Sequence, residues 1–340
     1  MGEDPKPLVL TQGDPAGIGI EITLRAWLQR SESDLPPFGL VGSPAVAAAA
    51  AHRFGWDVPI RETDPSDVSR VFRTALPVIP LSAPASAEPG CPDPETAEAT
   101  VESIETAVQL VRQGQARAVV TNPIAKHVLY TAGFSHPGHT EFLAALASDA
   151  SQTTLTPVMM LWSEALAVVP VTVHIPISAV PAALTRDLIV ATGRIVTKDL
   201  RERFGIAAPR LAVAGLNPHA GESGTIGTED RDVIAPAVAD LRSAGIDARG
   251  PLPADTMFHA AARTSYDVAL AMYHDQALVP IKTIAFDSAV NVTLGLPFVR
   301  TSPDHGTAFD IAGKGLARPD SLLAAIRLAA RISSQKPAAS

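Results

Sequence analysis

Short apolar runs alternate along the chain with longer segments whose apolar residues recur every three or four positions. The short runs predict buried strands, and the longer segments predict helices that turn one face to a core. The clearest strands are expected at residues 7–10, 38–41 and 116–120. Helices are expected at residues 20–30, 44–54, 185–204, 227–244 and 321–332, and another begins at Pro94. This alternation is typical of an α/β fold with mainly parallel sheets flanked by helices.

Three other segments carry weaker signals. Residues 76–94 are rich in proline, alanine and serine, which predicts a surface loop or an extended excursion. Residues 278–281 and 296–299 predict two further strands that end just before Lys282 and Arg300. A chain of 340 residues is long for a single core, so we expect two lobes, joined by strands or helices because no linker is visible.

Three histidines each follow the end of an apolar run. The runs and their histidines are residues 166–173 with His174, residues 211–218 with His219, and residues 268–273 with His274. Ligands bind at the carboxyl ends of the strands in an open α/β sheet. Three imidazoles gathered there would form a metal site with open positions for a substrate, whereas each one alone is equally compatible with a core histidine. Their separation along the chain excludes a local zinc finger or an HExxH helix.

Two acids lie close to these runs. Asp275 directly follows His274, and Asp255 lies in the segment Pro-Ala-Asp-Thr. Either carboxylate could orient an imidazole or accept a proton. Asp255 is equally compatible with the N-cap of a helix over residues 256–262.

Two glycine-containing turns suit an anionic substrate group. His139 and Thr140 follow Gly138 and offer hydrogen-bond donors, although Thr140 would equally cap a helix over residues 141–147. The glycine-rich segment 217–227 precedes a helix, and the N-terminus of a helix attracts phosphate or carboxylate.

Lys282, Asn291 and Arg300 add positive charge and an amide beyond the third histidine. A guanidinium at a strand end is suited to bidentate recognition of a carboxylate or phosphate. A solvated surface charge is the alternative for each basic residue, but the apolar residues beside them favour a binding role.

The overall composition excludes several classes of protein. The net charge is −8 and lysine and arginine form no cluster, so we expect neither a nucleic acid nor a membrane surface as partner. No signal peptide is visible, and the apolar stretch 157–173 is too short for a clean membrane span. The single cysteine, Cys91, excludes an intrachain disulfide and favours a cytoplasmic location. Gly13, Gly17 and Gly19 are not in the register of a Rossmann fingerprint.

Several blocks of sequence carry a resemblance to a known family. They are Thr11-Gln-Gly-Asp-Pro-Ala-Gly-Ile-Gly19, Thr121-Asn-Pro-Ile, Pro137-Gly-His-Thr-Glu141, Leu216-Asn-Pro-His-Ala-Gly-Glu222, Tyr273-His-Asp-Gln276, and residues 291–302 with Asp304-His-Gly-Thr307. In this order, over about residues 7–330, the chain resembles the 4-hydroxythreonine-4-phosphate dehydrogenase family of pyridoxal phosphate (vitamin B6) biosynthesis. Residues 222–227 differ from a common version of the family pattern, in which this segment is longer or contains a histidine.

The resemblance implies a two-lobed α/β fold like that of isopropylmalate and isocitrate dehydrogenases, without a Rossmann motif. We expect residues 1–135 and 305–340 in one lobe and residues 136–304 in the other. It also implies a homodimer whose active site lies between the lobes and takes residues from both subunits.

The resemblance further assigns roles to site residues. A divalent metal (zinc, magnesium or cobalt) would be bound by His174, His219 and His274, the last of them supplied by the partner subunit. The substrate would be held by His139, Thr140, Lys282, Asn291 and Arg300. Candidates for the catalytic residues are Asp255, Asp275 and Lys282.

The implied activity is oxidation of a small phosphorylated amino acid, 4-phosphohydroxy-L-threonine, with NAD or NADP as the hydride acceptor. The metal would lower the pKa of the substrate hydroxyl. The product, 2-amino-3-oxo-4-(phosphooxy)butanoate, would lose CO2 to give 3-amino-2-oxopropyl phosphate, because the metal and basic groups stabilise the enolate.

Three alternatives stay open on the sequence. A sister dehydrogenase with the same metal site would oxidise a phosphorylated sugar acid or a carboxylated aromatic cis-dihydrodiol. A metal-dependent hydrolase or lyase would activate water and leave the nicotinamide unreduced. A small-anion binding protein with structural histidines would hold no metal.

Overall fold

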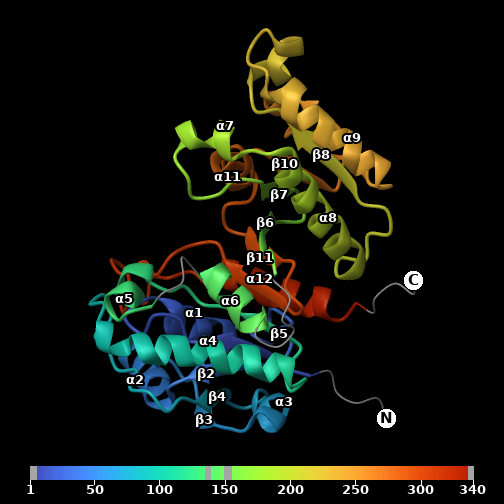
Figure 1. Ribbon diagram of the computed structural model, residues 1–340. Helices are drawn as coiled ribbons and strands as arrows, with labels where there is room; N and C mark the ends of the chain where they lie inside the picture. The colour runs from blue at the N-terminus through green and yellow to red at the C-terminus, as the bar shows by residue number, and fades with distance from the viewer. Residues whose placement is uncertain (1–5, 135–138, 149–154, 336–340) are drawn as a thin grey trace. The chain divides into compact units, whose positions relative to one another are not determined.

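The computed structural model describes residues 6–134, 139–148 and 155–335. The chain forms two compact units, whose elements are labelled in Figure 1. Unit 1 comprises Met1–Pro157 and Leu296–Ser333, and unit 2 comprises Val158–Gly295 with the last residues of the chain. The units therefore change over at 157/158 and 295/296, whereas the expected lobes change over at 135/136 and 304/305. The first of these expected boundaries lies outside the described residues.

The strands of unit 1 pair in parallel. In spatial order they are β3 (Ile60–Glu62), β4 (Leu76–Pro80), β2 (Phe38–Gly42), β1 (Leu8–Thr11), β5 (Ala118–Val120) and β12 (Val299–Pro303). All residues of β1, β2 and β5 are buried. Strands that are buried on both faces are expected as continuous apolar runs, and the three strands predicted from such runs are confirmed.

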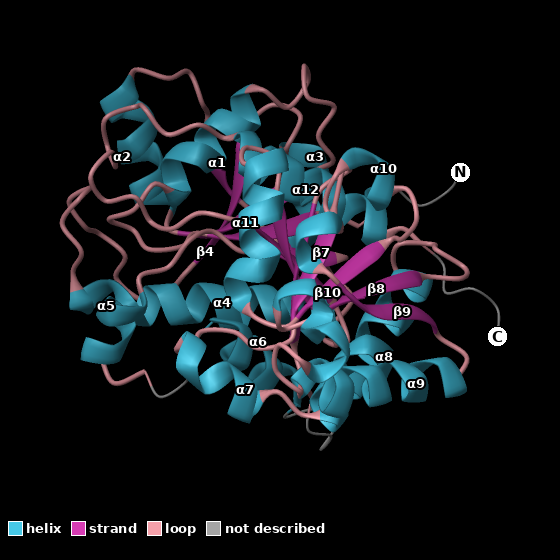
Figure 2. Ribbon diagram, turned by 90° about the horizontal axis from the view of Figure 1, so that it is seen from above, coloured by secondary structure: helices cyan, strands magenta, loops and turns pink. Residues whose placement is uncertain are grey.

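Helices cover these strands (Figure 2). In unit 1 they are α1 (Gly19–Leu28), α2 (Pro44–Phe54), α3 (Val68–Val71), α4 (Ala97–Arg112), α5 (Lys126–Thr131), α6 (His139–Ser148) and α12 (Asp320–Ser333), with short turns η1 (Pro65–Asp67) and η2 (Pro94–Thr96). The Ser43 side chain accepts a hydrogen bond from the Val46 amide at the start of α2, and Gly55 ends that helix at a φ of 64°. These are the start and stop signals that the sequence offers.

Two predictions in unit 1 are wrong. Residues 76–80 form the buried strand β4, not a surface loop, because burial of Leu76 and Val78 outweighs the loop signal of the neighbouring prolines. Arg300 does not follow a strand but is the second residue of β12, which begins at Val299. The apolar residues before Val299 pack into the core as a loop instead of forming the strand.

Unit 2 contains both parallel and antiparallel pairs. In spatial order its strands are β11 (Val290–Leu294), β6 (Val158–Trp162), β7 (Ala167–Pro170), β10 (Val268–Ala271), β8 (Arg210–Ala214) and β9 (Asp247–Leu252). β6 is antiparallel to β11 and β7, whereas β7, β10, β8 and β9 pair in parallel. The four parallel strands therefore end at one edge, as ligand-binding α/β sheets require.

The helices of unit 2 are α7 (Val180–Ala183), α8 (Arg186–Glu202), α9 (Ala235–Ser243), α10 (Ala260–Arg263) and α11 (His274–Ala285), with short turns η3 (Ile177–Ala179), η4 (Pro218–Gly224), η5 (Asp230–Ile234) and η6 (Ala254–Thr256). α8 packs on α9, and a Cβ on Gly193 would lie only 2.8 Å from Leu241. A side chain at residue 193 would therefore displace Leu241 of α9.

The strand expected at residues 278–281 is wrong, because these residues belong to α11. A short apolar run does not distinguish a strand from a buried turn of helix. The helix expected at residues 256–262 is divided between η6 and α10. No helix in the described part of the chain is both long and apolar enough to cross a membrane.

Candidate functional site

Chemically capable residues follow four neighbouring parallel strands of unit 2. His174 follows β7, His274 follows β10, His219 follows β8 and Asp255 follows β9. These strands are adjacent in the order β7-β10-β8-β9. The predicted placement of all three histidines beyond strand ends is therefore present in the structure.

His174 and His274 lie together in a pocket of about 210 Å³. Their ring centroids are 5.6 Å apart, and His174 has a left-handed backbone with a φ of 52°. The pocket is lined by Thr172, His174, Ile175, Ile177, Val180, Tyr273, His274 and Asp275. Two imidazoles and a carboxylate thus face a space large enough for an ion and part of a small substrate.

Asp275 orients the imidazole of His274. The His274 Nδ1 lies 2.7 Å from the Asp275 Oδ1, and His274 is the first residue of α11. A carboxylate held at Nδ1 fixes the ring and leaves Nε2 available to a ligand, as in many metal sites. The Asp275 side chain is 74% exposed, so it has the solvation of an ordinary surface carboxylate.

His219 lies in a turn of unusual backbone conformation. Residues 219–223 all have positive φ values, between 39° and 76°. This turn, η4, packs against η6, which carries Asp255. The side chains of His219 and Asp255 are both exposed, and the turns that carry them lie beyond the carboxyl ends of the neighbouring strands β8 and β9.

Within residues 6–134, 139–148 and 155–335, no three histidine, cysteine, aspartate or glutamate side chains converge to hold a metal ion. The chain brings two of the three expected imidazoles together. The expected set of three ligands stays a prediction.

The expected substrate residues are divided between the units. In unit 2, Lys282 lies on α11 with its Nζ 5.3 Å from the Phe286 ring centroid, and Asn291 is half-buried in β11. In unit 1, His139 and Thr140 are the first residues of α6. The side chains of His139 and Thr140 and the preceding residues 135–138 lie outside what the structure describes.

Arg300 is a buried cation in unit 1. It is 4% exposed, and its Nε and Nη2 donate hydrogen bonds to the Thr121 Oγ1 at 3.1 and 2.6 Å. Burial lowers the pKa of Arg300 to about 10, so the guanidinium remains charged at neutral pH. A desolvated charge of this kind interacts strongly with an anionic ligand.

Two residues near the histidines were missed from the sequence. Gln276 accepts a hydrogen bond from the Met272 amide (2.6 Å) and donates one to the Gly215 carbonyl (2.8 Å), which links the ends of β10 and β8. Asp230 is 2% exposed and accepts hydrogen bonds from the start of the His219 turn. The sequence signal that could have identified Gln276 is its position in the block Tyr273–Gln276. The corresponding signal for Asp230 is only its position at the start of an expected helix.

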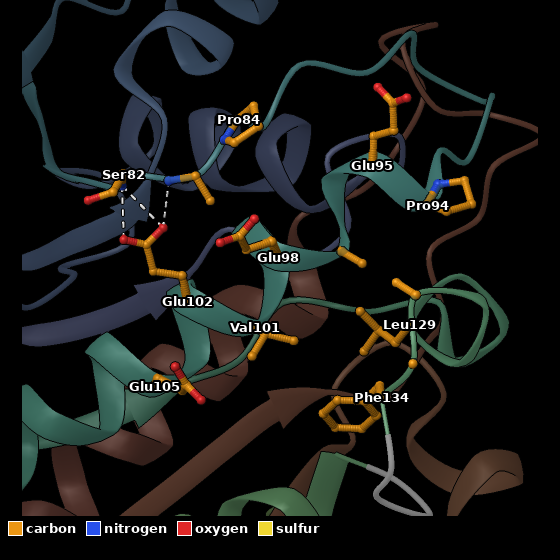
Figure 3. Close-up of a pocket in the computed structure, with 14 residues that line it drawn as sticks. Ser82, Pro84, Pro94, Glu95, Glu98, Val101, Glu102, Glu105, Leu129 and Phe134 are labelled. Atoms are coloured by element: carbon orange, nitrogen blue, oxygen red, sulfur yellow. Dashed lines mark hydrogen bonds between the residues drawn. The ribbon is translucent and has the colours of Figure 1, made fainter.

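Unit 1 also contains a larger pocket, of about 810 Å³, shown in Figure 3. Glu95, Glu98, Glu102 and Glu105 line it. The Glu102 carboxylate accepts hydrogen bonds from the Ser82 and Ala83 amides, which outweigh the effect of partial burial and hold its pKa below the usual value. Such a concentration of negative charge opposes a phosphorylated ligand, so the pocket is unsuited to the expected substrate.

The α/β fold and the strand-end histidines define an α/β enzyme with a polar site at the carboxyl edge of its strands. Comparison with known proteins gives the family. The family model described as "Pyridoxal phosphate biosynthetic protein PdxA" matches residues 35–329, and the chain belongs to this family. The resemblance expected from the sequence is confirmed.

The similar proteins agree with this assignment. The 4-hydroxythreonine-4-phosphate dehydrogenase of Methylorubrum populi is 65% identical over 340 residues, covering 99% of this chain and 97% of the relative. The crystal structure of the enzyme of that name from Klebsiella pneumoniae superposes with a TM-score of 0.84 at 36% identity, covering 97% of this chain and all of that one. Because its relatives are dehydrogenases, the protein is an oxidoreductase, and the family implies a nicotinamide cofactor.

A sister enzyme is also similar. Terephthalate 1,2-cis-dihydrodiol dehydrogenase from Burkholderia xenovorans has a TM-score of 0.64 at 30% identity, covering 96% of this chain and 97% of that one. Both measures are lower than for the Klebsiella structure.

Proposed function

We propose that this protein oxidises 4-phosphohydroxy-L-threonine to 2-amino-3-oxo-4-(phosphooxy)butanoate, with NAD+ or NADP+ as acceptor, in pyridoxal phosphate biosynthesis. The carbinol carbon loses a hydride to the nicotinamide, and the hydroxyl loses a proton to a base. The bond to the carboxylate then breaks, CO2 leaves and the resulting enolate is protonated to give 3-amino-2-oxopropyl phosphate. The observation that carries this proposal is the His174–His274 pocket in a chain 65% identical to an enzyme of this name.

The donor set fits a divalent metal. His174, His219 and His274 would hold it, and nitrogen donors favour zinc or cobalt over magnesium, which prefers oxygen. The contact between Asp275 and His274 supports this role, because ligating imidazoles commonly donate a hydrogen bond from their second ring N–H to a carboxylate. Polarisation of the substrate hydroxyl is the chemistry that such an ion supplies.

The remaining residues bind the substrate and move its protons. Lys282 and Arg300 suit a substrate that carries both a carboxylate and a phosphate, and His139, Thr140 and Asn291 add hydrogen-bond donors. Asp255 and Asp275 are the candidates for accepting the hydroxyl proton, and Lys282 is the candidate for protonating the enolate.

We further propose a homodimer with a shared active site. Two large apolar side chains, Val279 on α11 and Phe286 directly after it, are 62% and 71% exposed, and Ile177 beside the histidine pocket is 72% exposed. A second copy that covered them would remove a large apolar area from water. The expected contribution of the last histidine by the partner subunit, like the cytoplasmic location, stays a prediction.

Mixed dimers test how the site is shared. Subunits carrying His174→Ala would be co-expressed with subunits carrying His274→Ala. If the two imidazoles serve one site from different subunits, one site in each mixed dimer is intact, and each mixed dimer has about half of the activity of the unaltered dimer. If they serve it from the same chain, both sites are defective and no activity returns.

The reaction is tested by following reduced nicotinamide while the protein turns over 4-phosphohydroxy-L-threonine. Absence of reduction with NAD+ and NADP+ would contradict the proposal, and product formation without reduction would favour a hydrolase or lyase. The second candidate is oxidation of an aromatic cis-dihydrodiol carboxylate, which the likeness to the Burkholderia xenovorans enzyme favours. Terephthalate cis-dihydrodiol in the same assay distinguishes the two substrates.

A further inference from the structure

The turn that carries His219 requires support from its surroundings. Residues 219–223 all have left-handed backbone angles, and only Gly221 among them lacks a Cβ. Successive left-handed residues with side chains are unfavourable and persist only where neighbouring groups hold them in place. The contacts of this turn should therefore determine where the His219 imidazole lies.

Asp230 supplies those contacts from the start of η5. Its Oδ1 accepts a hydrogen bond from the Leu216 amide at 2.8 Å. Its Oδ2 accepts one from the Asn217 amide at 3.1 Å and one from the Asn217 Nδ2 at 2.8 Å. Leu216 and Asn217 are the residues through which the chain passes from β8 into the turn, so one buried carboxylate fixes its entry.

Two glycines make room for this carboxylate. A Cβ on Gly215 would lie 2.6 Å from the Asp230 Oδ1, and a Cβ on Gly221 would lie 3.1 Å from the Asp230 Oδ2. The Asp230 carboxylate thus lies against the backbone both at Gly215, where the chain enters the turn, and at Gly221, within the turn. Three hydrogen bonds converge on this one carboxylate, so the contact is suited to holding a strained backbone.

We propose that Asp230 is a positioning residue, which holds the His219 turn in the conformation that presents the imidazole to the metal. The inference rests on the proposed function, in which His219 is a metal ligand. Asp230 acts through the backbone of residues 216 and 217 and through the space beside Gly221. Partners of this kind beyond the ligands typically change metal affinity by about 10- to 100-fold.

The test is a calorimetric titration of the metal-free full-length protein with Zn²⁺. Asp230→Asn keeps one acceptor oxygen but turns an amide toward backbone donors, so its affinity should fall by about 10- to 100-fold. Asp199→Asn is the matched control, because Asp199 is a 3% exposed carboxylate of the same unit that accepts a hydrogen bond from the Gly295 amide at 2.8 Å. Its Zn²⁺ affinity should equal that of the unaltered protein, even if its Tm falls as far.

His219→Ala separates this inference from the function on which it rests. If His219→Ala loses Zn²⁺ affinity while Asp230→Asn keeps it, the positioning role is wrong and the metal site stands. If His219→Ala binds Zn²⁺ as the unaltered protein does, the proposed metal site itself is wrong. Should Asp230→Asn fail to fold, Asn217→Ala decides the matter, with Glu229→Gln as its control, because the Asn217 Nδ2 donates to the carboxylates of both Asp230 and Glu229. Weakened binding supports the role, and unchanged binding overturns it.

Discussion

The link made by Gln276 leads to a prediction about local stability at the candidate site. Its side chain joins the Met272 amide, just beyond β10, to the Gly215 carbonyl, just beyond β8. Both backbone groups belong to buried residues. Replacing Gln276 with Met keeps a side chain of similar length but removes the acceptor and the donor together.

The expected loss follows from the buried groups left without partners. An unsatisfied buried donor or acceptor costs about 1–3 kcal/mol. Two such groups give about 2–6 kcal/mol, and water entering beside the half-buried position should bring the cost toward about 2 kcal/mol. Because about 1.4 kcal/mol corresponds to a factor of ten, the Met272 amide should exchange its hydrogen about 30-fold faster.

Hydrogen exchange measured by mass spectrometry on peptides that contain Met272 checks this value. Gln276→Glu is the informative comparison, because it keeps an oxygen for the Met272 amide and loses only the donor to Gly215. Its Met272 amide should stay protected. Gln109→Met, on the exposed side of α4, should leave exchange unchanged. Equal exchange at Met272 in Gln276→Met and the unaltered protein would refute the reasoning.

Four further outcomes are expected. His219→Ala should abolish turnover and shift the Tm by no more than about 2 °C, because the side chain is exposed; near-normal turnover would contradict the metal site. Arg300→Lys, which keeps the charge but not the forked donors, should raise the KM of the phosphorylated substrate by about 10- to 100-fold with a smaller change in kcat. Ile104→Ala should lower the free energy of unfolding by about 2–5 kcal/mol in urea titrations, because Ile104 is fully buried in the core of unit 1. The pKa of Asp267 is also raised by burial, but hydrogen bonds from Arg210 outweigh this and lower it overall, so its carboxylate stabilises the fold above the unfolded pKa of about 3.9. Asp267→Asn should therefore be less stable than the unaltered protein at pH 7, and the difference should shrink as the pH falls below about 4 and disappear below the lowered pKa of the folded state; a difference as large at pH 3 as at pH 7 would contradict this assignment.

The sequence was sufficient where local signals and burial agreed. Ser43, Pro44 and Gly55 mark both ends of α2, and the structure has the predicted bounds of that helix. Continuous apolar runs likewise predicted β1 and β2, since strands buried on both faces need no polar alternation. The three histidines could be placed beyond strand ends in the same way, because each directly follows the end of an apolar run.

The remainder depended on contacts that a linear pattern does not contain. The prolines of residues 76–80 favour a loop, but the segment pairs with a strand on each side. That pairing is decided by tertiary packing, which the local sequence does not contain. Arg300 was expected after the end of a strand, because nothing in the neighbouring sequence indicates that it is a buried cation bonded to Thr121. Asp230 lies 14 residues after Leu216, beyond the whole His219 turn, and its role depends on the space left by two glycines.

The hydrogen bonds and ion pairs that hold the strands and turns around the histidines suggest that stability and metal affinity are set by different parts of the molecule. Arg210 and Asp267 join β8 and β10 at their amino ends, and Gln276 joins the same strands at their carboxyl ends. The strands are thus fixed at both ends, so the position of His219 depends mainly on the turn that follows β8. A substitution in the core of unit 1 should then lower the Tm without changing metal affinity. A change at Asp230 should lower metal affinity by more than a core substitution with the same loss of Tm, and proportional loss of both quantities across such variants would argue against this separation.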